Sequence, residues 1–164
     1  CASLLGGGPH GLQTVCGLMT SGGTESILSA VKASRDFMKE YAGKTSPEMI
    51  IADSAHPAFV KAASYFGIKL VKLPVDKHYR LTASAVERAI TRNTILVVAS
   101  SPGYPHGVMD EVQKIAHVAL KHRILCHVDG CLGAFVLPFA RKLGYDVPAF
   151  DFSLVGVTSM SADT

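Results

Sequence analysis

Apolar and polar positions form two kinds of pattern along the chain. Short apolar runs rich in β-branched residues predict strands, at residues 48–52, 68–73, 94–100, 124–128 and 152–159. Between these runs, apolar residues recur at helical spacing and predict helices, at residues 24–43, 57–66, 82–90 and 110–123. Thr24 offers a capping hydroxyl at the start of the first helix, and Gly43 is a natural stop at its end.

Strands and helices alternate repeatedly, and the connections between them are short. This order is typical of βαβ crossovers, so the pattern predicts an α/β fold with a mostly parallel sheet and helices on both faces. In such a sheet, ligands bind beside the carboxyl ends of the strands. The residues that directly follow the predicted strands are therefore the main candidates for chemistry.

The stretch "TSGGTES", residues 20–26, places Gly22, Gly23 and Thr24 at the start of the first predicted helix. Glycines allow backbone N–H groups to approach an anion, and the helix start adds the positive end of its dipole. The stretch fits a phosphate cradle, although it lacks the lysine of a Walker motif and departs from the G-x-G-x-x-G pattern of dinucleotide sites. A plain capped helix after a glycine turn fits it equally well.

Two loops that follow predicted strands carry aromatic and hydroxyl side chains. His56 directly precedes the proline that opens a helix. An imidazole there can lie flat over an aromatic ligand or, more commonly, form a hydrogen bond within its own loop. Ser101, Tyr104 and His106 belong to a loop with two prolines and two glycines, which make it rigid. Neither loop identifies a reaction by itself.

Asp129 ends the stretch "RILCHVD" and is the most informative polar residue. A carboxylate at the end of an apolar strand is expected to be buried enough to need a cation, and no lysine or arginine lies near it in sequence. A helix-capping aspartate is the alternative. The nitrogen of a pyridinium ring would supply the cation, because an ionised carboxylate beside it keeps it protonated.

Composition narrows the class of protein. With 164 residues, of which 48% are apolar and 18% charged, the chain is globular and has room for one sizeable core. Its net charge is +3 and its basic residues are scattered, which argues against nucleic-acid or membrane-surface binding. The four cysteines show no metal-ligand spacing, so we expect reduced thiols and no metal site. No signal peptide or spanning helix is recognisable, and the two ends indicate a piece of a longer protein.

The ordered motifs "TSGGTESI", "SAHPAF", "SSPGYPHGVMD", "HVDGCLGAF" and "GVTSMSADT" resemble the sphingosine-1-phosphate lyase family. These enzymes have fold type I, a transferase-like fold, and use pyridoxal 5′-phosphate (PLP). The resemblance implies that residues 1–164 are part of one PLP-binding large domain. It further implies that the PLP phosphate is held by Gly22, Gly23, Thr24 and Ser161, and that the ring contacts His56, Ser101 and Asp129. Tyr104 and His106 would line the reaction side and, with His56 and Asp129, be the catalytic residues, while Cys131 would lie in the pocket wall.

The resemblance also implies a reaction. Family members cleave a phosphorylated sphingoid base, by a retro-aldol route, to a long-chain aldehyde and phosphoethanolamine. The resemblance therefore implies a lipid substrate and a homodimer. It also implies a location at the endoplasmic reticulum membrane, held by an anchor outside this sequence, with the catalytic domain in the cytosol. An amino-acid decarboxylase that uses PLP and a non-catalytic α/β binding module remain the alternatives.

The sequence departs from the family pattern in four places. Gly130 stands where the family usually has alanine, Ala134 stands where it usually has glycine, and residues 6–14 resemble a local insertion. The family's Schiff-base lysine follows "SADT" almost at once, whereas this sequence ends there. We therefore expect the chain to stop just before the catalytic lysine and to be inactive alone.

Overall fold

The computed structural model describes residues 1–8 and 14–163. In chain order, its elements are η1 (Ser3–Gly7), α2 (Gly23–Ala42), β1 (Glu48–Ala52), α3 (Pro57–Phe66), β2 (Lys69–Leu73), α4 (Ala83–Ala89), β3 (Thr94–Ser100), α5 (Val112–Lys121), β4 (Leu125–Asp129), α6 (Leu137–Lys142) and β5 (Ser159–Ser161).

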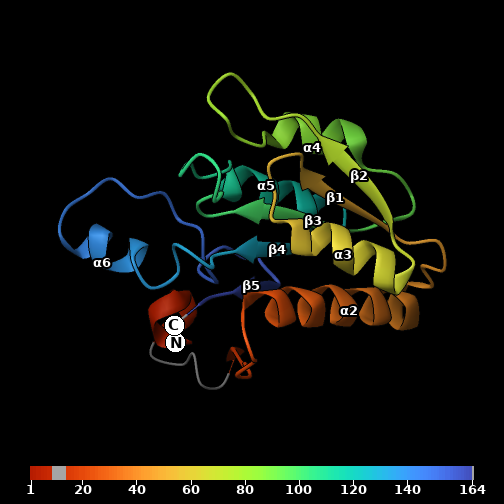
Figure 1. Cartoon of the computed structure of the whole chain (residues 1–164), viewed down its shortest axis with the longest axis horizontal. Coiled ribbons are helices and arrows are strands. Elements are labelled where there is room, and N and C mark those ends of the chain that lie inside the picture. Colours follow the sequence, from red (N-terminus) through yellow and green to blue (C-terminus); the bar gives the residue numbers. More distant parts are fainter. Residues whose placement is uncertain (9–13, 164) are drawn as a thin grey trace.

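The five strands form one sheet in the order β2-β1-β3-β4-β5, and each neighbouring pair is parallel. Every residue of β1 and of β3 is buried, as expected for strands with helices packed on both sides. Figure 1 shows the strands running side by side between the helices. The α/β fold with a mostly parallel sheet is thus confirmed.

Two separate apolar cores cover the two faces of the sheet. One joins α2 and α3 to the sheet through side chains such as Ile27, Val31 and Phe59. The other joins α4 and α5 through side chains such as Val86 and Ile115. Because each helix buries one apolar stripe against the sheet, the layers leave the strand ends and their loops as the place for polar groups.

The strand order reverses between β1 and β3, because the chain leaves β1 toward β2 on one side and later returns to place β3 on the other. At such a point, the loops after the two strands diverge and leave a crevice where ligands bind. Here the first loop carries His56 and the second carries Ser101 and Tyr104. The topology therefore directs three predicted site residues to one crevice.

Two predicted element boundaries differ from the structure near the expected site. α2 begins at Gly23 with Gly22 as its N-cap, and no side chain caps it, so Thr24 lies inside the first turn instead of capping the helix. The last strand covers only Ser159–Ser161, whereas residues 152–158 form turns. Asp151 causes part of this difference, since its carboxylate accepts hydrogen bonds from the backbone N–H and the hydroxyl of Ser153 and closes a turn.

The N-terminal glycine stretch is only partly described. Gly6 and Gly7 belong to η1, while residues 9–13 of the insertion expected at 6–14 lie outside the described residues. The backbone N–H of Phe152 donates to the carbonyl of Leu5, so η1 rests against the turns that precede β5. This contact places the described start of the chain near its described end, as Figure 1 also shows.

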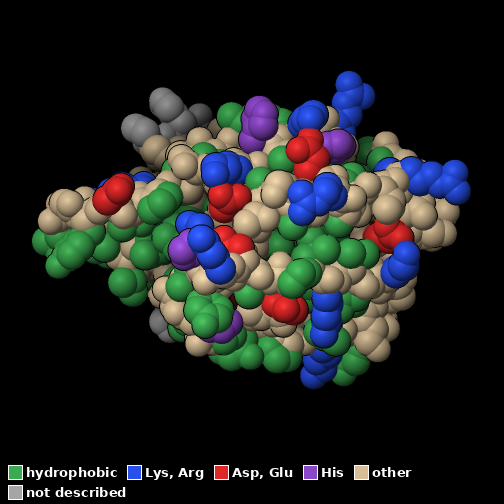
Figure 2. Space-filling model, turned by 90° about the horizontal axis from the view of Figure 1, so that it is seen from above, with side chains coloured by type: hydrophobic (Ala, Val, Ile, Leu, Met, Phe, Trp, Pro, Cys, Tyr) green, Lys and Arg blue, Asp and Glu red, His purple; other side chains and the backbone are tan. Residues whose placement is uncertain are grey.

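The helix α6 was not predicted from the sequence. It lies beside the sheet instead of on either face (Figure 1). Hydrophobic side chains in and around it are exposed: Leu132, Val136, Phe139, Leu143 and Tyr145. In Figure 2 hydrophobic side chains gather at the left end, whereas basic and acidic side chains lie interspersed over the rest of that face.

Within the described part of the chain, none of the helices combines the length and apolar character needed to cross a bilayer. All four cysteines are free thiols; Cys126 is buried and Cys131 is partly buried.

Candidate active site

Asp129 lies at the carboxyl end of β4, and β5 brings Ser161 directly beside it. The Ser161 hydroxyl donates to Oδ1 of Asp129 over 3.2 Å, and the backbone N–H of Cys131 donates to the same oxygen over 3.2 Å. The thiol of Cys131 also contacts the Ser161 hydroxyl, with 3.6 Å between Sγ and Oγ. Three predicted site residues therefore meet around one buried carboxylate.

The Asp129 carboxylate has no cationic partner among the described residues. Only 7% of the residue is exposed, and both of its side-chain hydrogen bonds go to Oδ1. A buried negative charge is unfavourable unless a cation or several donors compensate it. Within the described part of the chain, the second carboxylate oxygen is therefore available to a cationic ligand.

Ser101 joins the end of β3 to this cluster. Its backbone N–H donates to the backbone carbonyl of Asp129 over 2.8 Å. Its hydroxyl is fully buried and finds no hydrogen-bond partner among the described residues. An orphaned buried hydroxyl costs free energy unless a ligand or water satisfies it, so Ser101 also indicates a binding site.

His56 and Tyr104 meet across the crevice between β1 and β3. Their ring centroids are 5.7 Å apart in an edge-to-face arrangement. His56 is also the N-cap of α3, and its Nδ1 accepts a hydrogen bond from the backbone N–H of Ala58 over 3.1 Å. The ring is thus held within its own loop, which is compatible with both interpretations of this histidine. Stacking on a ligand ring stays a prediction.

His106 makes a different contact from the one expected. Its exposed ring stacks on Tyr79, from the segment between β2 and α4, with centroids 4.4 Å apart. The ring of Tyr104 contacts His56, so Tyr104 and His106 contact different residues although they belong to one loop. No described contact joins His106 to Asp129, and the place of His106 on the reaction side stays a prediction.

The start of α2 lies at the same end of the sheet as Asp129. A Cβ on Gly23 would come within 3.0 Å of the carboxylate of Asp163, two residues after Ser161. The backbone N–H of Ser21 donates to Glu25 over 2.6 Å. Protein carboxylates thus occupy the helix start in this conformation, and phosphate binding by Gly22, Gly23 and Thr24 stays a prediction.

Ser161 makes contacts that the sequence analysis did not anticipate. Its hydroxyl is buried and engaged with Asp129, Cys131 and His127. Its position beside the carboxylate gives it a part in fixing Asp129. Phosphate binding by Ser161 stays a prediction.

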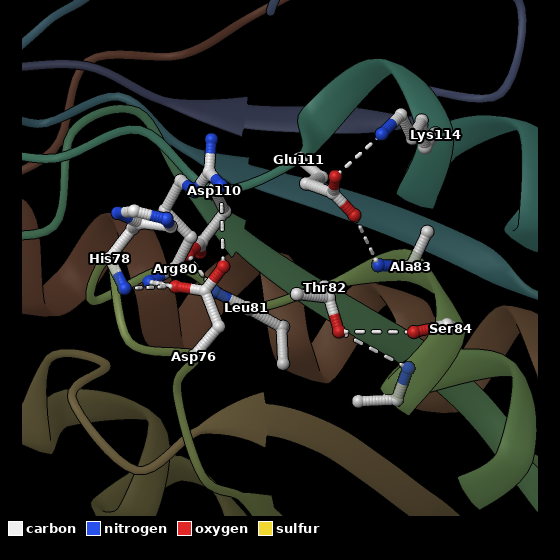
Figure 3. Close-up of polar contacts among 11 residues, drawn as sticks. Asp76, His78, Arg80, Leu81, Thr82, Ala83, Ser84, Asp110, Glu111 and Lys114 are labelled. Atoms are coloured by element: carbon white, nitrogen blue, oxygen red, sulfur yellow. Dashed lines mark hydrogen bonds and ion pairs between the residues drawn. The ribbon is translucent and has the colours of Figure 1, made fainter.

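Asp110 is a functional candidate that the sequence reasoning missed. Its carboxylate accepts a hydrogen bond of 2.7 Å from the backbone N–H of Leu81 (Figure 3). It accepts a second bond of 2.7 Å from the backbone N–H of Ser100, and so fixes the end of β3 next to Ser101. Burial raises its pKa to about 6 although these two donors favour the ionised form. The sequence pattern placed Asp110 in the first turn of a helix, whereas α5 begins only at Val112.

His127 is the second missed candidate. A strand alternates its side chains between two faces, so residues 127 and 129 share one face of β4. That spacing was visible in the sequence as "HVD" but gave no partner for the histidine. The partners are hydroxyls of β5, which pairs with β4 only in the folded sheet.

Among the described residues, a buried carboxylate without a cationic partner and a buried hydroxyl without a hydrogen-bond partner lie at the carboxyl ends of parallel strands, where a doubly wound α/β protein binds its ligand. Over residues 2–159, the chain matches the family described as "Pyridoxal-dependent decarboxylase conserved domain". The chain therefore belongs to this family, and the PLP dependence expected from the sequence is confirmed at the level of the family.

Individual relatives carry more specific names. A sphingosine-1-phosphate lyase of Arabidopsis thaliana is 59% identical over 91% of this chain, which covers 27% of that protein. A solved sphingosine-1-phosphate lyase of Burkholderia pseudomallei is 46% identical with a TM-score of 0.85, over 87% of this chain and 33% of that one. An L-aspartate decarboxylase of Thermococcus kodakarensis is 40% identical over 93% of this chain and 39% of that protein. The chain thus spans well under half of each relative.

The residues present fit PLP. The cofactor carries a ring nitrogen that is cationic when protonated, and Asp129 is a buried carboxylate that lacks a cation in the described part of the chain. The cofactor also carries a ring hydroxyl, and Ser101 offers an unpartnered buried Oγ. Two independent features of the protein thus match two groups of the cofactor.

Proposed function

We propose that this chain is the PLP-binding part of a sphingosine-1-phosphate lyase, which cleaves a phosphorylated sphingoid base to a long-chain aldehyde and phosphoethanolamine. The single observation that carries the proposal is the pairing of Asp129 with Ser161 and Cys131 at the carboxyl ends of β4 and β5. The names and identities of the relatives support the same activity, since lyases of this name are 59% and 46% identical to the chain.

The residues of the site take separate tasks in this proposal. PLP, when bound, supplies an electron-withdrawing ring that accepts the electrons of the broken bond. Asp129 holds a proton at the ring nitrogen, because its ionised carboxylate favours the charged form of that nitrogen. Ser101 orients the ring through its Oγ, and His56 covers one side of the site from the loop after β1. Tyr104, His106 and Cys131 line the substrate side.

We include a homodimer at the endoplasmic reticulum membrane in this proposal. The homodimer is supported by the exposed apolar side chains around α6, such as Phe139 and Leu143, since contiguous exposed apolar surface commonly marks a protein interface. The membrane location rests on the family resemblance alone. Sedimentation of the purified longer protein and its localisation in cells test these two statements separately.

An assay of the longer protein tests the activity. Purified protein loaded with PLP is given a phosphorylated sphingoid base and, in parallel, L-aspartate and L-glutamate. The proposal expects long-chain aldehyde from the first substrate and no carbon dioxide from the amino acids. Carbon dioxide without aldehyde would instead support the amino-acid decarboxylase, and failure to bind PLP or to turn over any substrate would support the non-catalytic module.

A further inference from the structure

His127 is completely buried between β5 and α3. Its Nδ1 lies 2.9 Å from the hydroxyl of Ser159, and its Nε2 lies 3.2 Å from the hydroxyl of Ser161. The ring of Phe59 approaches the imidazole edge to face, with centroids 5.8 Å apart. Both ring nitrogens therefore have hydroxyl partners, and an aromatic ring packs against the imidazole.

Hydrogen bonds link Ser159, His127, Ser161 and Asp129 in a row. The Asp129 carboxylate at the end of this row determines the direction of each bond. An ionised carboxylate only accepts, so the Ser161 hydroxyl must donate to Asp129. The oxygen of Ser161 then accepts from His127, which requires the proton on Nε2. Nδ1 is left as an acceptor for the Ser159 hydroxyl. The row runs in one direction, from Ser159 through His127 and Ser161 to Asp129.

The imidazole in this row is neutral. Burial lowers the pKa of His127 to about 4, and the Asp129 carboxylate opposes this shift only in part. This neutrality has a consequence for the site. A protonated His127 would be a resident cation close to Asp129 and would compensate the charge that a ligand cation needs. A neutral His127 supplies a donor without removing that charge.

We infer that His127 is a positioning residue: through the Ser161 hydroxyl it fixes the orientation of the Asp129 carboxylate and leaves its charge to the ring nitrogen of PLP. The inference rests on the proposed function for the identity of the ligand. The row of hydrogen bonds itself does not depend on that function. His127 touches neither cofactor nor substrate in this arrangement and acts through Ser161.

Solid-state ¹⁵N NMR of the full-length protein tests the row directly. Protein with ¹⁵N-labelled histidine reports which ring nitrogen of His127 carries the proton, and His127→Gln assigns the signal by removing it. We expect a neutral ring protonated at Nε2 in the cofactor-free protein. A ring protonated at Nδ1, or an imidazolium near neutral pH, would overturn the inference whatever reaction the protein catalyses.

A second measurement follows the ring nitrogen of ¹⁵N-labelled PLP in the loaded protein. His127→Leu removes the donor, whereas His127→Gln keeps an N–H donor near the same place. We expect the ring nitrogen to lose part of its protonation and kcat to fall about tenfold with little change in KM in His127→Leu, because the Ser161 hydroxyl loses the donor that orients it toward Asp129. His127→Gln should retain both properties to a large extent.

If His127→Leu fails to fold, the same measurement is made on Ser161→Ala, which removes the hydrogen bond between Ser161 and Asp129 at the end of the same row. Ser34→Ala is the matched control, since Ser34 is also a buried hydroxyl but donates only to the carbonyl of Ala30 within α2. Unchanged ring-nitrogen protonation in Ser161→Ala, or an equal loss in Ser34→Ala, would overturn the positioning role. If the unmodified protein neither binds PLP nor cleaves the lipid, the proposed function fails. The histidine measurement then still tests the direction of the hydrogen bonds from Ser159 to Asp129.

Discussion

The backbone N–H of Ser101 donates to the backbone carbonyl of Asp129, with 2.8 Å between nitrogen and oxygen. This bond joins the residue after β3 to the last residue of β4 and continues the parallel ladder beyond the strand. It fixes the backbone of Ser101, whose buried hydroxyl has no hydrogen-bond partner among the described residues, to the backbone of Asp129, whose carboxylate has no cationic partner there. The two features that match PLP are therefore fixed relative to each other by the backbone, not by flexible side chains.

Replacement of Asp129 by asparagine should remove most of the activity of the full-length enzyme. The change keeps the shape of the side chain but removes the charge that holds a proton at the ring nitrogen. We expect turnover to fall by about two orders of magnitude, equivalent to about 3 kcal/mol of activation free energy. Steady-state kinetics measures this loss. Asp36→Asn, on an exposed part of α2, is the control, and near-normal turnover in Asp129→Asn would exclude the role.

Replacement of Gly133 by alanine should disturb the site through its backbone. An added Cβ would lie 2.0 Å from the carbonyl oxygen of Ser101, so the loop after β3 must move. We expect a loss of about 1–3 kcal/mol of unfolding free energy and weaker PLP binding. Gly156→Ala is the matched control, because its Cβ would overlap the carbonyl of Ala116 in α5, away from Ser101. Denaturant unfolding and cofactor titration of both variants separate the two effects.

Asp110 should make stability depend on pH. Its pKa is raised from 3.8 to about 6 in the folded protein, so the folded state binds the proton more tightly than the unfolded state. The unfolding free energy should therefore fall as the pH rises through this interval, by up to about 3 kcal/mol from this residue. Asp110→Asn does not titrate and should lose that part of the slope. Equal slopes of unfolding free energy against pH in both proteins would contradict the prediction.

Cys131 should react slowly with alkylating reagents. Burial raises its pKa to about 12, and the nearby Asp129 carboxylate acts in the same direction, so little thiolate exists near neutral pH. Mass spectrometry of iodoacetamide-treated full-length protein should find Cys131 far less modified at pH 8 than denatured protein under the same conditions. PLP should protect it further if the thiol lines the cofactor pocket. Rapid labelling in the folded protein would show that the thiol is more exposed or more acidic than described.

Reduction with borohydride should locate the lysine that binds PLP outside residues 1–164. The resemblance implies a lysine that follows "SADT", and the lysines of this chain lie on other elements. Lys61 and Lys72 line a cavity that also includes Tyr104, so they are the alternatives to check. Peptide mapping of PLP-loaded, borohydride-treated full-length protein measures the position of the adduct. A stoichiometric adduct on Lys61 or Lys72 would show that the expected lysine is misplaced.

The sequence alone determined the alternation of strands and helices and the class of the sheet. Hydrophobic periodicity is a local property, so β1, α3 and β3 were predicted with their observed bounds. The sequence also indicated Asp129 as a site residue, because a carboxylate directly after an apolar strand is recognisable in a single sequence. The boundary of β5 was missed because the turn closed by Asp151 depends on one side chain and interrupts an apolar run.

Only the tertiary structure decided which side chains act together. The order of the strands places β5 beside β4 and so brings Ser159 and Ser161 to His127, more than thirty positions away in sequence. Asp110 became a buried acceptor because its carboxylate reaches the backbone of Leu81 and Ser100 instead of the start of α5. Hydrogen-bond direction and burial depend on neighbours distant in the chain, and periodicity along the chain carries no information about them.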